Sequence, residues 1–261
     1  MPVVSFIACR IFEDEIVHII ENDGSVNTVL IVDNDDSDGI VQKLSSAGCG
    51  YTLVTNGSIP DHLDDDGDLV LVVEMLELAL HAKPDNLKEV VYNKAREMSE
   101  YSDGILLFYG LCGNSLARVE SDLADLPCHV SLLKESNGMA IDDCIGAVFG
   151  SRAAYLEKLT GFKGVGTFFM TPMWAANWRE MTVSAGITPD PNDITLTKFV
   201  FDAVGYKNVA KVDTGLHYEK DFDDRVDEVA QLFDFNIIDM KGSPDLMVRC
   251  YKQLKDEVLD A

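Results

Sequence analysis

The sequence is poor in basic residues. It has 21 Lys and Arg against 45 Asp and Glu, which gives a formal net charge of −24. A surface with such an excess of negative charge repels nucleic-acid phosphates and anionic lipids. We therefore expect neither nucleic acid nor a membrane among the partners of this protein. The acids are spread along the whole chain, so we attribute them to solubility rather than to a binding tail.

Long apolar runs are also missing. No stretch approaches the roughly 20 apolar residues that a membrane-spanning helix needs. The start, MPVVSFIACRIF, has no basic region ahead of its apolar residues, so it does not read as a secretory signal. These absences predict a cytoplasmic protein, in whose reducing compartment cysteines stay free thiols.

Several common cofactor motifs are absent as well. None of the six cysteines forms a CxxC pair, which argues against zinc ribbons and thioredoxin-like redox sites. The chain has no GxxxxGK[ST] loop and no GxGxxG after its first apolar run, so a nucleotide site is not expected.

Short apolar runs alternate with amphipathic segments from end to end. VVSFIAC, LVLVVEML and GILLFYGLC are typical of buried strands, and the segments between them are helix-like, including one expected helix over residues 141–161. This alternation predicts an α/β fold with a mostly parallel, doubly wound, Rossmann-like sheet and helices on both faces. We expect residues 1–261 to form a single α/β domain, or two similar lobes that meet near residues 161–166.

Reactive side chains recur where expected strands end and expected helices begin. They are Cys9 and Cys112 at strand ends, His81 after LVLVVEML, and Asp143 with Cys144 at a helix start. The carboxyl ends of parallel strands share one edge of a sheet, so these side chains can converge there. Cys, His and Asp together are typical ligands of zinc, and thiolates also hold iron–sulfur clusters. Free cysteines are also common as buried packing residues with no chemical role.

The turn around Cys112 has a second interpretation. GLCGN resembles the strand–turn–helix elbow GxSxG, with Cys112 in the place of the serine nucleophile and Asn114 in place of the second glycine. His81 or His129 would then act as the base. This interpretation predicts a hydrolase with Cys112 as its catalytic residue and no bound metal.

Further along the chain, Arg152 and Tyr155 lie one helical turn apart in FGSRAAYLEKL. They could bind an anionic substrate or cofactor, or simply form a surface pair. We carry both residues as candidate cofactor-binding positions.

Four segments occur in an order that resembles a known family. They are LELALHAKPDNLKE, ILLFYGLCGNSL, DDCIGAVFGSRAAYLEKL and GVGTFFMTPMW. In these segments, and over most of its length, the chain is similar to the domain of unknown function 1638 family. Cys9, His81, Cys112 and Cys144 fall on characteristic positions of that family. The resemblance implies an anaerobic setting of methanogens and related organisms, beside genes for corrinoid-dependent methyltransferases.

Together, the residues and the resemblance lead to one expected function. We expect a metal-dependent methyltransferase or accessory factor of anaerobic one-carbon metabolism (methylamine and corrinoid methyl transfer), with Cys9, Cys112 and Cys144 as ligands of zinc or an iron–sulfur cluster. His81 or Asp143 would be a fourth ligand or lie beside the ligands. The resemblance further implies a small molecule or a corrinoid protein as partner, and a corrinoid as a further cofactor.

One position departs from the family pattern. Asp142 stands where the pattern has a histidine before Asp143 and Cys144. Either Asp142 replaces that histidine as a ligand, or the position holds no ligand. A non-catalytic metal or corrinoid carrier or chaperone stays open beside the enzyme and the Cys112 hydrolase.

Overall fold

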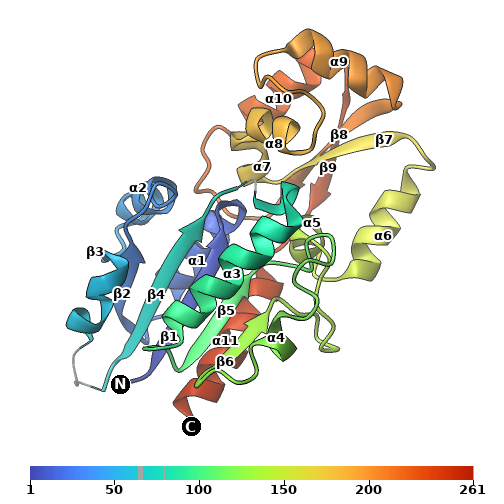
Figure 1. Cartoon of the computed structure of the whole chain (residues 1–261). Helices are drawn as coiled ribbons and strands as arrows, with labels where there is room; N and C mark the ends of the chain where they lie inside the picture. The colour runs from blue at the N-terminus through green and yellow to red at the C-terminus, as the bar shows by residue number, and fades with distance from the viewer. Residues whose placement is uncertain (64–66, 79, 261) are drawn as a thin grey trace. The chain divides into compact units, whose positions relative to one another are not determined.

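The computed structural model describes residues 1–63, 67–78 and 80–260. The chain divides into two compact units, one formed by Met1–Cys144 with Asp245–Ala261 and the other by Ile145–Pro244 (Figure 1). Each unit is built on a parallel sheet with helices between the strands, which confirms the α/β fold class. Residues 161–166, where the sequence suggested that two lobes meet, lie inside the second unit.

The first unit contains a six-stranded sheet with the strand order β3-β2-β4-β1-β5-β6, in which all neighbours are parallel. Its strands are β1 (Val3–Cys9), β2 (Val26–Val32), β3 (Thr52–Val54), β4 (Leu69–Leu76), β5 (Gly104–Phe108) and β6 (His129–Leu132). Every residue of β1 and β4 is buried. The nearly continuous apolar runs of these strands follow from this position, because both faces of a central parallel strand are covered.

Helices cover both faces of this sheet. They are α1 (Glu13–Asn22), α2 (Asp38–Ala47), α3 (Pro84–Met98), α4 (Val119–Asp122) and α11 (Asp245–Leu259), with short 3-10 helices η1 (Arg10–Phe12), η2 (Asn56–His62) and η3 (Leu80–Ala82). On β1, Phe6 contacts Tyr251 of α11, with ring centroids 5.4 Å apart. The next residue, Ile7, is level with Glu74, which pairs with Lys94 of α3 at 2.8 Å. Successive strand residues point to opposite faces, so α11 and α3 lie on opposite faces.

The second unit contains a three-stranded parallel sheet with the order β7-β8-β9. Its strands are β7 (Gly166–Met170), β8 (Tyr206–Asp213) and β9 (Asn236–Lys241). Its helices are α6 (Arg152–Gly161), α7 (Pro172–Ala176), α8 (Trp178–Ser184), α9 (Ile194–Ala203) and α10 (Phe222–Phe233). The short helix α5 (Cys144–Val148) begins at the last residue of the first unit. Aromatic side chains that include Phe168, Trp178, Phe201 and Phe233 form its core.

The single helix expected over residues 141–161 is wrong, because the structure has two shorter helices there. Gly150 has a left-handed backbone with φ of 77°, which ends α5. Ser151 then caps α6, its Oγ accepting a hydrogen bond from the N–H of Ala154 at 3.1 Å.

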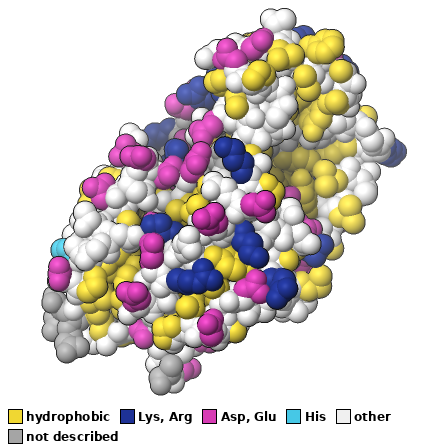
Figure 2. All heavy atoms as spheres, viewed as in Figure 1, with side chains coloured by type: hydrophobic (Ala, Val, Ile, Leu, Met, Phe, Trp, Pro, Cys, Tyr) yellow, Lys and Arg dark blue, Asp and Glu magenta, His cyan; other side chains and the backbone are white. Residues whose placement is uncertain are grey.

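Charged side chains of both signs are interspersed on the visible surface of the first unit (Figure 2). The acidic side chains do not form one continuous patch on that face, in keeping with their even spread along the sequence. None of the helices in the described residues combines the length and the hydrophobicity of a membrane-spanning segment.

Candidate thiol site at the carboxyl edge of the first sheet

Three of the predicted site residues follow three neighbouring strands. Cys9 ends β1, His81 lies in η3 after β4, and Cys112 lies in the turn after β5. Because β4, β1 and β5 are adjacent, these residues lie along one carboxyl edge, where open α/β sheets bind their ligands. The expectation that Cys112 ends the strand itself was wrong, since β5 stops at Phe108.

The turn with Cys112 is joined to the segment 141–144. The N–H groups of residues 111 and 112 donate to the carbonyl oxygens of residues 141 and 142, at 2.8 and 2.9 Å. Gly110 permits this contact, because a Cβ atom there would lie 2.8 Å from the Asp142 carbonyl group. The pairing brings Asp143 close to Cys112, and Cys144 follows directly at the start of α5. Cys112 and Asp143, which are far apart in the sequence, are thus neighbours in the fold.

The backbone of the turn is strained at its cysteine. Cys112, Gly113 and Asn114 have φ angles of 45°, 66° and 74°, all in the left-handed region. This conformation costs a residue with a Cβ about 1 to 2 kcal/mol, and such strain is concentrated at functional sites. Ser115 closes the turn, its Oγ donating to the carbonyl oxygen of Cys112 at 3.0 Å.

Cys9 is buried and Cys112 is partly buried, and the two thiols are close enough for charge on Cys112 to affect the pKa of Cys9. The pKa of Cys9 is raised to about 12, chiefly by burial and also by negative charge on Cys112, while a backbone hydrogen bond with Ile11 and the charge of Arg10 oppose the rise. Burial likewise raises the pKa of Cys112 to about 11, opposed by a backbone hydrogen bond with Gly110 and assisted by Asp143. Both side chains are therefore neutral thiols near pH 7, and thiolates would need a cation beside them.

Leu78 connects Cys9 with His81. The sulfur of Cys9 lies 3.9 Å from the carbonyl oxygen of Leu78, to which it donates a weak hydrogen bond. His81 forms a hydrogen bond with the backbone of the same residue. Desolvation lowers the pKa of His81 and outweighs that hydrogen bond, so its ring is neutral near pH 7, the form that binds metals or acts as a base.

Tyr109 is a site residue that the sequence analysis missed. It is 3% exposed, and its hydroxyl has no hydrogen-bond partner among the described residues. Burial raises its pKa well above the ordinary value, and negative charge on Cys9, Cys112 or Asp36 raises it further. The hydroxyl is therefore a buried donor close to both thiols. The sequence feature that could have indicated this residue is the position of Tyr109 in ILLFYGLC, directly between a buried strand and the turn with Cys112.

A buried charge cluster fixes the chain just after Cys9. Glu13 accepts from Arg10 Nε at 3.2 Å and pairs with Lys43 Nζ at 3.0 Å. Lys43 also contacts Asp14 at 2.7 Å. Glu13 and Asp14 are each 1% exposed and Lys43 is 9% exposed. These charges are buried because they are paired, and they hold the start of α1 against α2. Three consecutive acids after the first strand, EDE, were the signal for this cluster.

The predicted ligands do not form a complete metal-binding set. Across residues 1–63, 67–78 and 80–260, no three His, Cys, Asp or Glu side chains are grouped closely enough to hold a metal ion. The structure instead provides the neighbouring thiols of Cys9 and Cys112, with Asp143 near the second. None of the six cysteines, all of which lie in the described residues, forms a disulfide bond.

The remaining candidates lie elsewhere. His129 begins β6 level with Gly104, the first residue of β5, so it lies at the amino edge of the sheet and cannot serve Cys112 as a base. In the second unit, the ring of Tyr155 stacks on Phe149 with centroids 6.0 Å apart. Arg152 is the first residue of α6. A cofactor contact by Arg152 or Tyr155 stays a prediction.

The chain matches a family model over most of its length. A family model described as "Protein of unknown function (DUF1638)" matches residues 75–251. The matched region contains His81, Cys112 and Cys144 and begins after Cys9. No curated protein and no solved structure matches the chain. Since the match covers more than half of the sequence, the protein belongs to the DUF1638 family.

Proposed function

We propose that this protein binds a thiophilic metal ion at the carboxyl edge of its first sheet, with Cys9 and Cys112 as the anchoring ligands. The main supporting observation is that two neighbouring cysteines, the buried Cys9 and the partly buried Cys112, follow the adjacent strands β1 and β5 beside the hydroxyl of Tyr109. Sulfur donors select zinc or an iron–sulfur cluster over harder ions.

Further ligands would come from the segments that border the two thiols. Asp143 lies close to Cys112 because residues 111–112 pair with residues 141–142, and Cys144 is the next residue of the chain. His81 and Cys9 are linked by Leu78, since both form hydrogen bonds with its backbone. Because the described residues do not group three such side chains, the proposal requires the segment 141–144 or η3 to move toward the thiols when the metal binds.

The chemistry of such a site follows from its thiolates. A zinc ion held by protein thiolates keeps a further thiol deprotonated, which is the form that accepts a methyl group. The chain's own contribution is a water-poor environment around Cys9 and a phenol, Tyr109, that can donate a hydrogen bond to a bound anion. Anaerobic one-carbon metabolism, with a small molecule or a corrinoid protein as partner and a corrinoid as further cofactor, stays an expectation from the family resemblance.

A second candidate function uses Cys112 as a nucleophile. The left-handed backbone of Cys112 favours it, since nucleophile elbows present their side chain on such a strained turn. The raised pKa of Cys112 opposes it, because the thiolate is the reactive form. A base such as His81 would have to reach the thiol.

Metal analysis of protein purified without oxygen tests the proposal. We expect stoichiometric zinc, or iron with sulfide and a brown absorption band, in the wild type and in the control Cys49→Ser. Cys49 is the residue after the Gly48 cap of α2 and is remote in sequence from both anchors. Cys9→Ser and Cys112→Ser should each lose most of the metal.

Equal metal content in all four proteins would contradict the proposed ligands. Absence of metal, together with much faster alkylation of Cys112 than of Cys49 by iodoacetamide, would instead support the nucleophile.

A further inference from the structure

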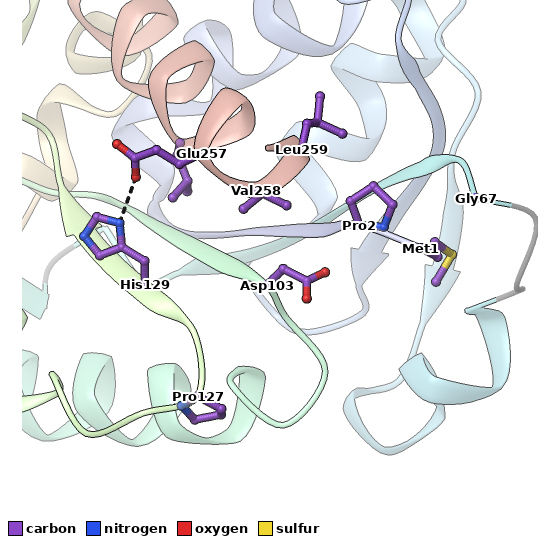
Figure 3. A pocket seen from close by; sticks show the side chains of 10 residues that line it. Met1, Pro2, Gly67, Asp103, Pro127, His129, Glu257, Val258 and Leu259 are labelled. Carbon is purple, nitrogen blue, oxygen red and sulfur yellow. Dashed lines mark hydrogen bonds and ion pairs between the residues drawn. The ribbon is translucent and has the colours of Figure 1, made fainter. Parts of the chain in front are cut away.

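A cavity of about 630 Å³ opens at the amino edge of the first sheet, opposite the thiols (Figure 3). The two acids among its described lining residues already have partners. Glu257 pairs with Nδ1 of His129 at 3.0 Å, and Asp103 accepts a hydrogen bond from the N–H of Val3 at 2.8 Å. Hydrogen-bond donors that lack a partner among the described residues lie instead at the carboxyl edge, where they indicate the ligand of the thiol site.

Arg10 directly follows Cys9, and its side chain is 26% exposed. Its Nε donates to Glu13 at 3.2 Å, which orients the guanidinium group. Its Nη1 lies 3.9 Å from the carboxylate of Asp36, which is too far for a hydrogen bond. A guanidinium has N–H donors on all three nitrogens. Those of the two terminal nitrogens therefore have no hydrogen-bond partner among the described residues.

The hydroxyl of Tyr109 is a second unused donor in the same region. Extending the parallel register of β1 and β5 by one residue places Cys9 level with Tyr109, and Arg10 follows. Tyr109 is 3% exposed, and its hydroxyl has no partner among the described residues. Negative charge on Asp36 raises the pKa of Tyr109, and Asp36 is also the acid beside Nη1 of Arg10. Both unused donors therefore lie near Asp36.

Unused donors of these two kinds suit a carboxylate. The parallel N–H groups of a guanidinium match the two oxygens of a carboxylate, and a hydroxyl can add a further hydrogen bond. Burial keeps the phenol of Tyr109 protonated near pH 7, so it is available as a donor. Cys9 and Cys112 are close to the same hydroxyl. A short ligand bound through its carboxylate would therefore have its other end beside the two thiols.

We propose that Arg10 and Tyr109 bind the carboxylate of a small thiol compound, a mercaptocarboxylate, whose sulfur binds the metal ion of the thiol site. The terminal nitrogens of Arg10 and the hydroxyl of Tyr109 donate to the carboxylate oxygens. The sulfur contact rests on the proposed function, because it needs the metal. The carboxylate contact does not need the metal, so the two contacts can be tested separately.

Calorimetric titration of the metal-free full chain with sodium butyrate, at neutral pH and physiological salt, tests the carboxylate contact alone. We expect saturable binding of one butyrate per chain and much weaker binding of n-butanol. Arg10→Gln and Tyr109→Phe should each weaken butyrate binding about tenfold. Tyr109→Phe leaves the contact between Arg10 and Glu13 in place, so it tests the proposal even if Arg10→Gln destabilises the fold.

The matched control is Arg96→Gln, which removes the same charge from an exposed position in the last turn of α3. It should bind butyrate as the wild type does. Equal loss in Arg96→Gln and Arg10→Gln would overturn the proposal, because the attraction would then come from the overall charge. Equal binding of butyrate and n-butanol, or no saturable binding of butyrate, would overturn it as well.

Titration of the zinc-loaded chain tests the sulfur contact. Mercaptopropionate should bind more tightly than both butyrate and mercaptopropanol, and Arg10→Gln should remove its advantage over mercaptopropanol. Butyrate binding that depends on Arg10, without added affinity from the thiol, would overturn the sulfur contact. A chain that binds no zinc would contradict the proposed metal site, whereas the butyrate titration would still decide the carboxylate contact.

Discussion

Gly110 and Asp142 approach each other so closely that a Cβ atom on Gly110 would lie 2.8 Å from both the carbonyl carbon and the carbonyl oxygen of Asp142. No other residue type fits without moving one of the two segments. The contact fixes residues 141–144 beside the turn of Cys112, and therefore decides which side chains can join a site there.

The substitution Gly110→Ala should separate these segments. We expect a loss of about 1 to 3 kcal/mol in the free energy of unfolding, measured by urea denaturation, and a loss of bound metal in the purified protein. Gly50→Ala is the matched control, because a Cβ at position 50 meets nothing within 4 Å. Wild-type stability and metal content in Gly110→Ala would show that the close contact does not shape the site.

The buried charge cluster depends on Lys43. Lys43→Met should destabilise the fold by about 3 to 5 kcal/mol, because Glu13 and Asp14 would lose a buried cationic partner. Lys207→Met is the control, since Lys207 and Asp202 form an exposed pair that is worth about 1 kcal/mol or less. Similar urea midpoints for the two variants would contradict the assigned role of Lys43.

Glu15 should make stability depend on pH. Burial, reinforced by Asp14, raises its pKa from 4.5 to about 8. Between these two values the folded chain holds a proton that the unfolded chain releases, so stability falls as pH rises, by at most about 1.4 kcal/mol per pH unit from this group. Glu15→Gln removes that contribution, so the variant should gain stability over the wild type as pH rises from 5 toward 8. Parallel stability curves for the two proteins would refute this.

The substitution Tyr109→Phe should affect ligand affinity but not the stability of the fold. Its hydroxyl has no partner among the described residues, so its removal should change the free energy of unfolding of the metal-free protein by about 1 kcal/mol or less. If the hydroxyl donates to a bound anion, affinity for that ligand in the metal-loaded protein should fall about tenfold. Thiol compounds such as mercaptoethanol are suitable probes. An unchanged affinity would exclude Tyr109 from the site.

Much of the fold could be predicted from local patterns. The apolar runs VVSFIAC and LVLVVEML marked β1 and β4 because central parallel strands are buried on both faces. The break at Gly150 was missed because nothing in the apolar pattern distinguishes a glycine inside a helix from one that ends it. The two units and their separate sheets depend on long-range pairing, which a local pattern does not contain.

The site was predictable only in part for the same reason. Strand ends placed Cys9, His81 and Cys112 on one edge, since parallel strands share that edge. The proximity of Asp143 to Cys112 depends on backbone hydrogen bonds across about 30 residues of intervening chain. The burial of Tyr109 likewise depends on tertiary packing that strand periodicity alone does not give.

Cobalt titration of the metal-free protein, followed by absorption, tests the central claim most directly, because thiolate-to-cobalt bands grow with the number of sulfur ligands. We predict intense near-ultraviolet bands that saturate at one cobalt per chain. They should be reduced in both Cys9→Ser and Cys112→Ser and unchanged in Cys49→Ser. Bands that persist unchanged in the Cys9 and Cys112 variants, or no thiolate band in the wild type, would contradict a metal site anchored by these two cysteines.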